Sequence, residues 1–482
     1  MEKLTKLVKS KKLLYLGIIF LLFFIPLYPK FPLVAVSDTY VSVRLEDIFV
    51  ALLVTFFAIW LLLNREVKIL RLGVTRLIIL YLVTGLLSVF SGIWITKNII
   101  PHLAFLHLLR RAEYISLFFV AYYSFSEIKQ LKNYGWATFI SALGVIFYGL
   151  GQKFFGWPVV STMNKEFSKG MILKLTWWAR INSTFAGHYD LAAYMAMILS
   201  LVVVSFMITK NWREKILITL GGLFSYYLLI LTASRISFAA YLVSVFLVLL
   251  ISKRKLLVFP FLVFSILGMV FSADLGQRYA ATFKINLSFL SGMVKVKPRV
   301  PVASTLIPTP TLVVMAPVVS LPPKIPTLTP TPPGATPSTE YFEPTDLAVG
   351  RSTDIRLKVE WPRAARAFLK NPLLGTGYSS ITLASDNDYL RMLGETGILG
   401  SLAFFAIILE LFRQILLYWR GKCSSKEGKL IILGITGSSL AFFLNATFID
   451  VFEASKIAFF YWILMGLALR IVNLETQAKN QR

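Results

Sequence analysis

Long apolar runs, separated by short polar stretches that carry lysine and arginine, recur along most of this chain. A helix needs about 20 apolar residues to cross a bilayer, and a chain that is 56% hydrophobic has more apolar surface than a water-soluble globule can bury. We therefore predict an all-α integral membrane protein with about twelve transmembrane helices. The predicted spans are residues 13–28, 48–63, 77–94, 102–125, 136–152, 189–208, 216–231, 236–251, 256–271, 397–417, 430–448 and 457–471.

The positive residues predict the orientation of these spans. Counted from a cytoplasmic start, the lysine and arginine clusters fall in alternate connecting segments on one side, as the positive-inside rule requires. No small-residue cleavage site follows the first run, so we interpret it as a retained span. We expect a multi-pass protein of the cell membrane with both termini cytoplasmic. The net charge of +26 is explained by these clusters, and we expect no nucleic-acid partner.

Three regions follow from this pattern. Residues 1–271 hold spans 1–9, residues 272–396 form a large extracytoplasmic loop between spans 9 and 10, and residues 397–482 hold spans 10–12 and a cytoplasmic tail. Within the loop, residues 298–337 contain twelve of the chain's 21 prolines, mixed with threonine. Such a composition predicts a disordered insertion, either a spacer or a site for O-linked sugar.

The second part of the loop has a different pattern. Across residues 350–370, apolar positions recur at helical spacing among basic ones, which predicts a basic amphipathic helix, bent near Pro362. The sequence Asn-Pro-Leu-Leu-Gly-Thr-Gly at residues 371–377 should end it. We expect this helix to lie over the polar end of the protein as a lid.

Metal chemistry is not indicated by the sequence. Cys423 is the only cysteine, and the three histidines are scattered along the chain. Zinc and similar metals need several such ligands at characteristic spacings. We predict no bound metal and no cofactor.

Residues 385–400 mark the border between the long polar loop and the next apolar run. Asp386, Asn387, Arg391 and Glu395 lie close to the predicted membrane there. So many polar groups at that depth usually need polar partners or a water-filled cavity, so we interpret the stretch as the edge of an active site. The alternative is an interfacial helix cap, with Asp or Asn at the N-cap position.

Two outer arginines point to an anionic ligand. Arg180 lies just before a span, and Arg235 lies in a very short junction between two spans. A guanidinium held at the interface can bind phosphate oxygens with paired hydrogen bonds. The alternative is that each arginine reaches lipid headgroups. His188, at the start of a span, fits a capping or a catalytic role equally, and Arg111 fits an internal ion pair or part of the cavity.

Several of these stretches together resemble the O-antigen ligase and O-antigen polymerase family of bacterial membrane glycosyltransferases. The order of the motifs and the long outer loop between the ninth and tenth spans carry the resemblance, from about Arg44 to Ile471. The motifs are Arg110-x-x-Glu113-Tyr114, residues 180–192, Leu-Thr-Ala-Ser-Arg at 231–235, residues 371–377, residues 387–400, and Ser455-Lys456 with Trp462.

The resemblance implies an outward-facing, metal-independent enzyme of cell-surface polysaccharide biosynthesis. Such an enzyme moves a glycan from a polyprenyl (undecaprenyl) pyrophosphate donor to an acceptor hydroxyl on a glycan, a lipid or a protein, with inversion at the anomeric carbon. Arg180 and Arg235 match the pyrophosphate-binding arginines of the family. The residue before Asn387 is usually a histidine that activates the acceptor, and here it is Asp386, which we predict to be the base. We also expect substrate contacts from the side chains of Asn387, His188, Arg111, Arg351 and Glu395.

Other functions remain compatible with the sequence. A protein O-oligosaccharyltransferase would use the same donor with a protein hydroxyl as acceptor. A polysaccharide transporter or flippase of about twelve helices would bind its substrate near the midplane, usually between repeated halves, and this chain shows no repeat. A sensor or adhesion stalk that displays the Pro/Thr segment would not need Arg235 or Asp386.

Overall fold

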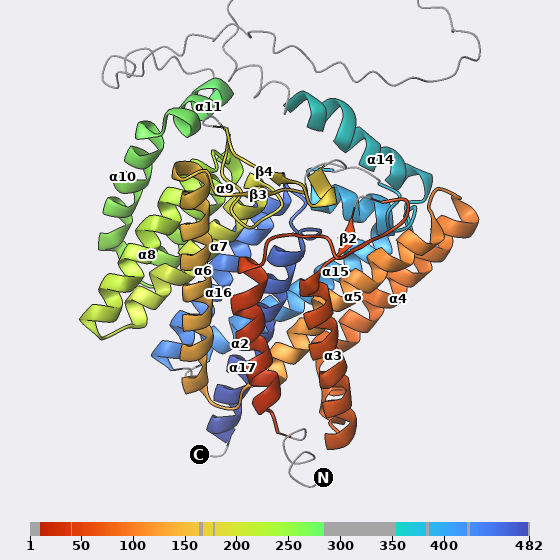
Figure 1. Cartoon of the computed structure of the whole chain (residues 1–482). Helices are drawn as coiled ribbons and strands as arrows, with labels where there is room; N and C mark the ends of the chain where they lie inside the picture. Colours follow the sequence, from red (N-terminus) through yellow and green to blue (C-terminus); the bar gives the residue numbers. More distant parts are fainter. Residues whose placement is uncertain are drawn as a thin grey trace, which may run out of the picture.

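The computed structural model describes residues 10–39, 41–162, 167–176, 179–283, 353–381, 385–421 and 425–480. Over these ranges the chain is a bundle of helices with two small antiparallel hairpins (Figure 1). Strand β1 (Val34–Ala35) pairs with β2 (Ser42–Val43), and β3 (Val159–Val160) pairs with β4 (Ile172–Leu173). The predicted insertion at 298–337 lies outside the described residues.

A helix lies at each predicted span. These helices are α2 (Lys12–Leu27), α3 (Leu45–Asn64), α4 (Gly73–Phe90), α5 (Pro101–Ser124), α6 (Leu131–Phe154), α7 (His188–Ile208), α8 (Trp212–Leu231), α9 (Arg235–Ile251), α10 (Lys255–Phe271), α15 (Asp388–Arg420), α16 (Lys426–Ala446) and α17 (Ser455–Asn480). The shorter elements are η1 (Val67–Arg71), η2 (Ser91–Ile95), η3 (Ile128–Gln130), η4 (Phe167–Lys169), α11 (Ala273–Phe283), η5 (Arg356–Glu360) and α14 (Trp361–Lys370).

The structure confirms the predicted class of helical membrane protein, but it does not confirm the predicted number of membrane spans. Among the described residues, 8 helices are long and apolar enough to cross a bilayer. Helices α2, α9 and α10 are apolar but shorter. Helix α5 carries Arg110, Arg111 and Glu113 in its middle. The total of twelve spans stays a prediction.

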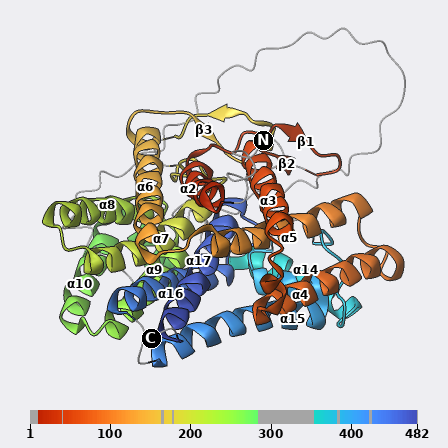
Figure 2. The same ribbon diagram turned by 90° about the horizontal axis from the view of Figure 1, so that it is seen from below.

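Helix α17 forms the centre of the bundle, where 83% of its most apolar window is buried. It packs against α5, while α16 packs against α7 and α9 (Figure 2). Small residues line the closest approaches, as is usual between membrane helices. A Cβ added at Gly437 of α16, for example, would meet the side chains of Val248 and Ser200.

The two ends of the bundle differ. The first residues of α2 and the last residues of α17 lie at one end, whereas α11, α14 and both hairpins lie at the other (Figure 1). The predicted position of the long loop on the outer side of the membrane stays a prediction. We refer below to the hairpin end as the outer end.

Helix α15 begins at Asp388, earlier than the predicted start of span 10 at Gly397. The predicted boundary instead falls on a break, because Gly397 has a non-helical backbone with φ 64° and ψ −166°. The turn at residues 371–377, which ends α14 as predicted, docks into this break. The N–H of Ile398 donates to the carbonyl of Pro372 at 2.8 Å, and the N–H of Gly377 donates to that of Glu395 at 2.9 Å. The turn thereby satisfies backbone groups that lipid could not.

We expect Gly397→Ala to destabilise the protein. The positive φ is strained for alanine, and the added Cβ would collide with the carbonyl of Leu373. Such strain costs about 1–3 kcal/mol, before the collision is counted. The melting temperature of the purified protein in detergent should fall. Gly135→Ala is the matched control, because nothing lies within 4 Å of a Cβ at that helical position. Equal melting temperatures for the two variants would contradict the expected role of the break.

Candidate active site

Arginines from four separate segments meet at the outer end of the bundle. Arg180 precedes α7, Arg235 is the first residue of α9, Arg278 belongs to α11, and Arg356 is the first residue of η5. The charges of Arg180, Arg278 and Arg356 all act on Tyr189, and Arg235 lies within range of Arg278, Arg356 and the same tyrosine. We call Arg180, Arg235, Arg278 and Arg356 the outer arginine cluster.

Arg235 is fixed by the tight turn between α8 and α9 and by α11, which lies over it. Ala233 in the turn has a positive φ of 51°. The Nη1 of Arg278 donates to the carbonyl of Ala233 at 3.3 Å, and the hydroxyl of Tyr279 donates to that of Arg235 at 2.5 Å. The guanidinium of Arg235 itself donates to the hydroxyl of Thr282. The short junction therefore holds Arg235 at the outer end of the bundle, as defined above.

Arg278 is buried and has no charged partner among the described residues. Its side chain is only 4% exposed, and its Nε has no hydrogen-bond acceptor among the described residues. Neither Arg278 nor Arg235 forms an ion pair with a described carboxylate. Burying a cation without a counter-ion is costly, so the arrangement favours an anionic ligand that supplies the missing charge.

Arg180 reaches the first residue of α7. Its Nη1 donates to the Nε2 of His188 at 2.9 Å. Because a guanidinium can only donate, this imidazole nitrogen must be the acceptor and unprotonated. The N-cap of α7 is Gly187, with no side-chain cap, so His188 orients Arg180 rather than capping the helix.

Asp386 closes the cluster on one side. Its Oδ2 accepts from both Nε and Nη2 of Arg356, at 2.9 and 2.8 Å. Asp386 has a positive φ of 47°, a strained conformation for a non-glycine residue that its neighbours must enforce. The N–H of Ser385 donates to Asp450 at 2.8 Å, and Asn387 caps α15 by accepting from the N–H of Leu390 at 3.0 Å. The helix-cap alternative is therefore confirmed for Asn387.

Burial and ion pairing act in opposite directions on Asp386. Burial raises the pKa of its carboxyl above the ordinary value of 3.8, while Arg356 partly offsets that increase. The negative charge of Asp450 raises the pKa further. The Asp386 carboxylate is thus anchored to one arginine of the cluster.

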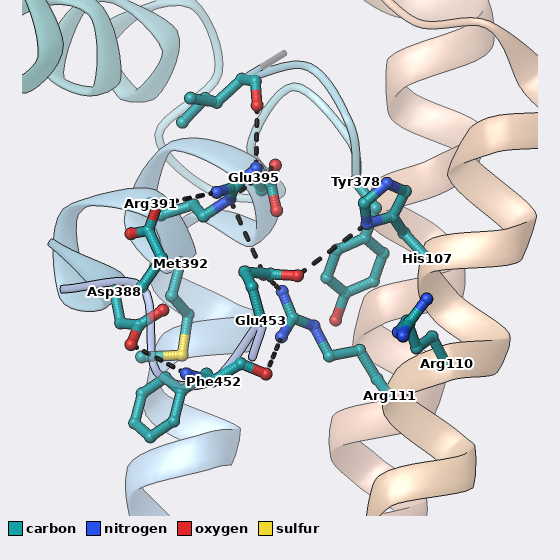
Figure 3. Close-up of polar contacts among 12 residues, drawn as sticks. His107, Arg110, Arg111, Tyr378, Asp388, Arg391, Met392, Glu395, Phe452 and Glu453 are labelled. Carbon is teal, nitrogen blue, oxygen red and sulfur yellow. Dashed lines mark hydrogen bonds and ion pairs between the residues drawn. The ribbon is translucent and has the colours of Figure 1, made fainter. Parts of the chain in front are cut away.

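A second group of charges lies deeper, between α5, α15 and the turn before α17. We call Arg111, Arg391, Glu395, Asp450 and Glu453 the buried ion-pair network. Arg111 donates to the carbonyl of Phe452 at 3.2 Å and to the carboxylate of Glu453 (Figure 3). Arg391 lies 3.1 Å from Asp450, 3.4 Å from Glu395 and 3.7 Å from Glu453.

The network connects α5 to α15 and to the turn before α17, segments that lie far apart in the sequence. A cavity of about 30 Å³ remains beside it, lined by Arg111, Asp388 and Trp462 among others. That volume holds about one water molecule and no sugar. Arg111 forms an internal ion pair and also lines this cavity, and its predicted contact with the substrate stays a prediction.

The predicted site residues fall into two groups. Asp386, Arg180, Arg235 and His188 meet at the outer arginine cluster. Arg111 and Glu395 belong to the buried ion-pair network, which comes near Asp386 where Asp450 accepts from Ser385 and pairs with Arg391. Arg351 lies outside the described residues.

Sequence reasoning missed two members of the cluster. Arg278 follows the ninth span in a stretch with no other signal. Arg356 is one of several basic residues in the predicted amphipathic helix, and sequence alone did not distinguish it from its neighbours. Among the described residues, no group of three or more His, Cys, Asp or Glu side chains could hold a metal ion.

Comparison with known families connects this geometry to a class of proteins. Residues 220–405 match the family model described as O-antigen ligase. The match confirms the resemblance and includes Arg235, Arg278, Arg356 and Asp386. A search of curated proteins found no match to the chain.

Proposed function

We propose that this chain transfers a glycan from a polyprenyl pyrophosphate donor to an acceptor hydroxyl. Its residues 220–405 match the O-antigen ligase family model, which supports the proposal. The domain indicates a glycosyltransferase-like enzyme, and the apolar helices place it in a membrane as a multi-pass protein. We propose that the reaction serves cell-surface polysaccharide synthesis at the outer face of the cytoplasmic membrane, with both termini cytoplasmic.

The outer arginine cluster is the observation that carries the proposal. Its members come from four segments, and Arg278 is buried with an unsatisfied Nε. Guanidinium groups suit phosphate oxygens in both charge and hydrogen-bond geometry. A pyrophosphate would be the negatively charged partner that Arg235 and Arg278 do not have among the described residues.

The proposed chemistry is a single displacement. The acceptor oxygen forms a bond to the anomeric carbon of the donor sugar, while the bond from that carbon to the pyrophosphate oxygen breaks. The electron pair leaves with the lipid pyrophosphate, whose developing charge the arginines stabilise. The acceptor proton passes to a carboxylate on the side of Asp386, and the configuration at the anomeric carbon inverts.

The experiment that tests this function compares cells with and without the gene, together with a strain that carries an Arg235→Ala copy. Accumulation of single lipid-linked repeats would identify a polymerase, and accumulation of complete lipid-linked chains would identify a ligase. The Arg235→Ala copy should not restore the wild-type pool. An unchanged pool in all strains would exclude glycan transfer and favour transport or display.

A further inference from the structure

Glu360 is a carboxylate beside the outer arginine cluster that the proposed chemistry has not yet used. It is the last residue of η5, four residues after Arg356, so the two side chains share one face of the helix. The negative charges of Asp386 and Asp450 act on it from the loop before α15 and from the turn between α16 and α17. Arg356 and Arg363 act on it from its own segment. Glu360 therefore lies where three segments meet.

The start of α14 is fixed against the turn that precedes α17. Nη2 of Arg356 donates to the carbonyl of Phe448 at 3.4 Å. The ring of Trp361 packs on the ring of Phe448, with 6.0 Å between their centroids. These contacts hold the Glu360 backbone in place beside the cluster.

Three polar atoms on this helical turn are buried without a hydrogen-bond partner among the described residues. They are Oε2 of Glu360, Nε1 of Trp361 and Nη1 of Arg363. Buried polar atoms usually have partners, so three orphans within four residues indicate a place for a ligand or water. The orphan Oε2 of Glu360 can accept the proton of a hydroxyl group, which both donates and accepts.

The carboxylates of Asp386 and Glu360 differ in their hydrogen-bond and ion-pair partners. Two N–H groups of Arg356 hold Oδ2 of Asp386. No ion pair within 4.0 Å joins Glu360 to a described cation, and its Oε2 is an orphan. A general base needs an oxygen that can receive the proton.

We propose that Glu360 is the general base that takes the proton from the acceptor hydroxyl, with Asp386 as the residue that positions Arg356. The inference rests on the proposed function and names the proton acceptor of that same site. In the step, the Glu360 carboxylate becomes a carboxylic acid as the acceptor oxygen bonds to the anomeric carbon and the lipid pyrophosphate leaves. The orphan Nη1 of Arg363, three residues further along the same helical face, holds the acceptor oxygen.

The electrostatics of the site support this role. Burial, with the charges of Asp386 and Asp450, raises the pKa of Glu360 from 4.5 to about 7, against the opposing effect of Arg356 and Arg363. A base works best when its pKa lies near the ambient pH. Because the protonated form is inactive as a base, transfer should increase as the pH rises through about 7.

The test measures glycan transfer against pH in membrane vesicles from cells that make both substrates. Glu360→Gln should lower kcat by about 100-fold or more. It should also remove the acidic limb of the pH–rate profile, which is the decrease in transfer rate below about pH 7. Asp386→Asn should keep that limb, moved to lower pH because a negative charge is lost, and should mainly raise KM. Asp354→Asn is the matched control, since Asp354 pairs with Lys358 in solvent on the same segment.

One further measurement, of donor binding, separates the possible failures. Glu360→Gln should bind undecaprenyl pyrophosphate in detergent like the wild type, which shows that the variant is folded and the arginines are intact. Near-normal transfer with the acidic limb unchanged in Glu360→Gln would overturn the role of Glu360 alone. Absence of transfer by the wild type would instead overturn the proposed function.

Discussion

Arg278→Ala is expected to lower glycan transfer by about 100-fold or more, the cost of removing one preorganised donor that stabilises developing charge. The guanidinium is buried, and its Nε has no acceptor among the described residues, so a bound pyrophosphate would rely on it in a low-dielectric surrounding. Transfer in membrane vesicles and the Kd for undecaprenyl pyrophosphate in detergent measure the effect. Arg278→Lys should recover only part of the loss, because an ammonium lacks the planar fork of donors.

The control for this prediction is Arg413→Ala. Arg413 is 61% exposed and pairs with Glu410 on the same helix, so its loss should change neither transfer nor donor binding. The melting temperature of Arg278→Ala reports whether the lost bond to the carbonyl of Ala233 disturbs the fold. A variant that is stable and still transfers at the wild-type rate would remove Arg278 from the pyrophosphate site.

The sequence predicted the helices well because each span is encoded locally. Hydrophobic length and the positive clusters at the ends need no knowledge of the neighbours. The start of α15 was predicted too late, because its first turns contain Asp388, Arg391 and Glu395 and have the composition of a polar loop. Those residues are helical because they are paired inside the bundle, which no local pattern reveals.

The site was predictable only in part, for a similar reason. Arg235 was identified because a four-residue junction restricts where it can lie. Arg278 stands out only through its burial, and Glu360 only through the charges of Asp386 and Asp450 on other segments. Glu395 lies close to Asp386 in sequence, yet α15 places it in the buried ion-pair network. The spacing of residues along the chain predicted which side chains lie close to the membrane. It did not predict which partner each side chain contacts.

Glu453→Gln is expected to destabilise the protein strongly. Glu453 accepts from Arg111 of α5 and lies 3.7 Å from Arg391 of α15, so it joins two helices to the turn before α17. Removing its charge leaves two buried guanidinium groups without that partner, and breaking a buried pair in this way costs about 3–5 kcal/mol. Thermal unfolding in detergent should show a much lower melting temperature, whereas Glu410→Gln, at a pair with the exposed Arg413, should cost about 0–1 kcal/mol.

The pH dependence of stability gives an independent check on Glu453. Burial opposes its ionisation, but Arg111, Arg391 and His107 together lower the pKa of the carboxyl below its ordinary value of 4.5. A group with a lowered pKa in the folded state stabilises above its unfolded pKa, and the contribution is lost as the pH falls through the folded value. The wild type should therefore lose stability below about pH 4.5, and Glu453→Gln should lose less over the same range. If the two proteins showed the same acid dependence, Glu453 would not be the ionised centre of the network.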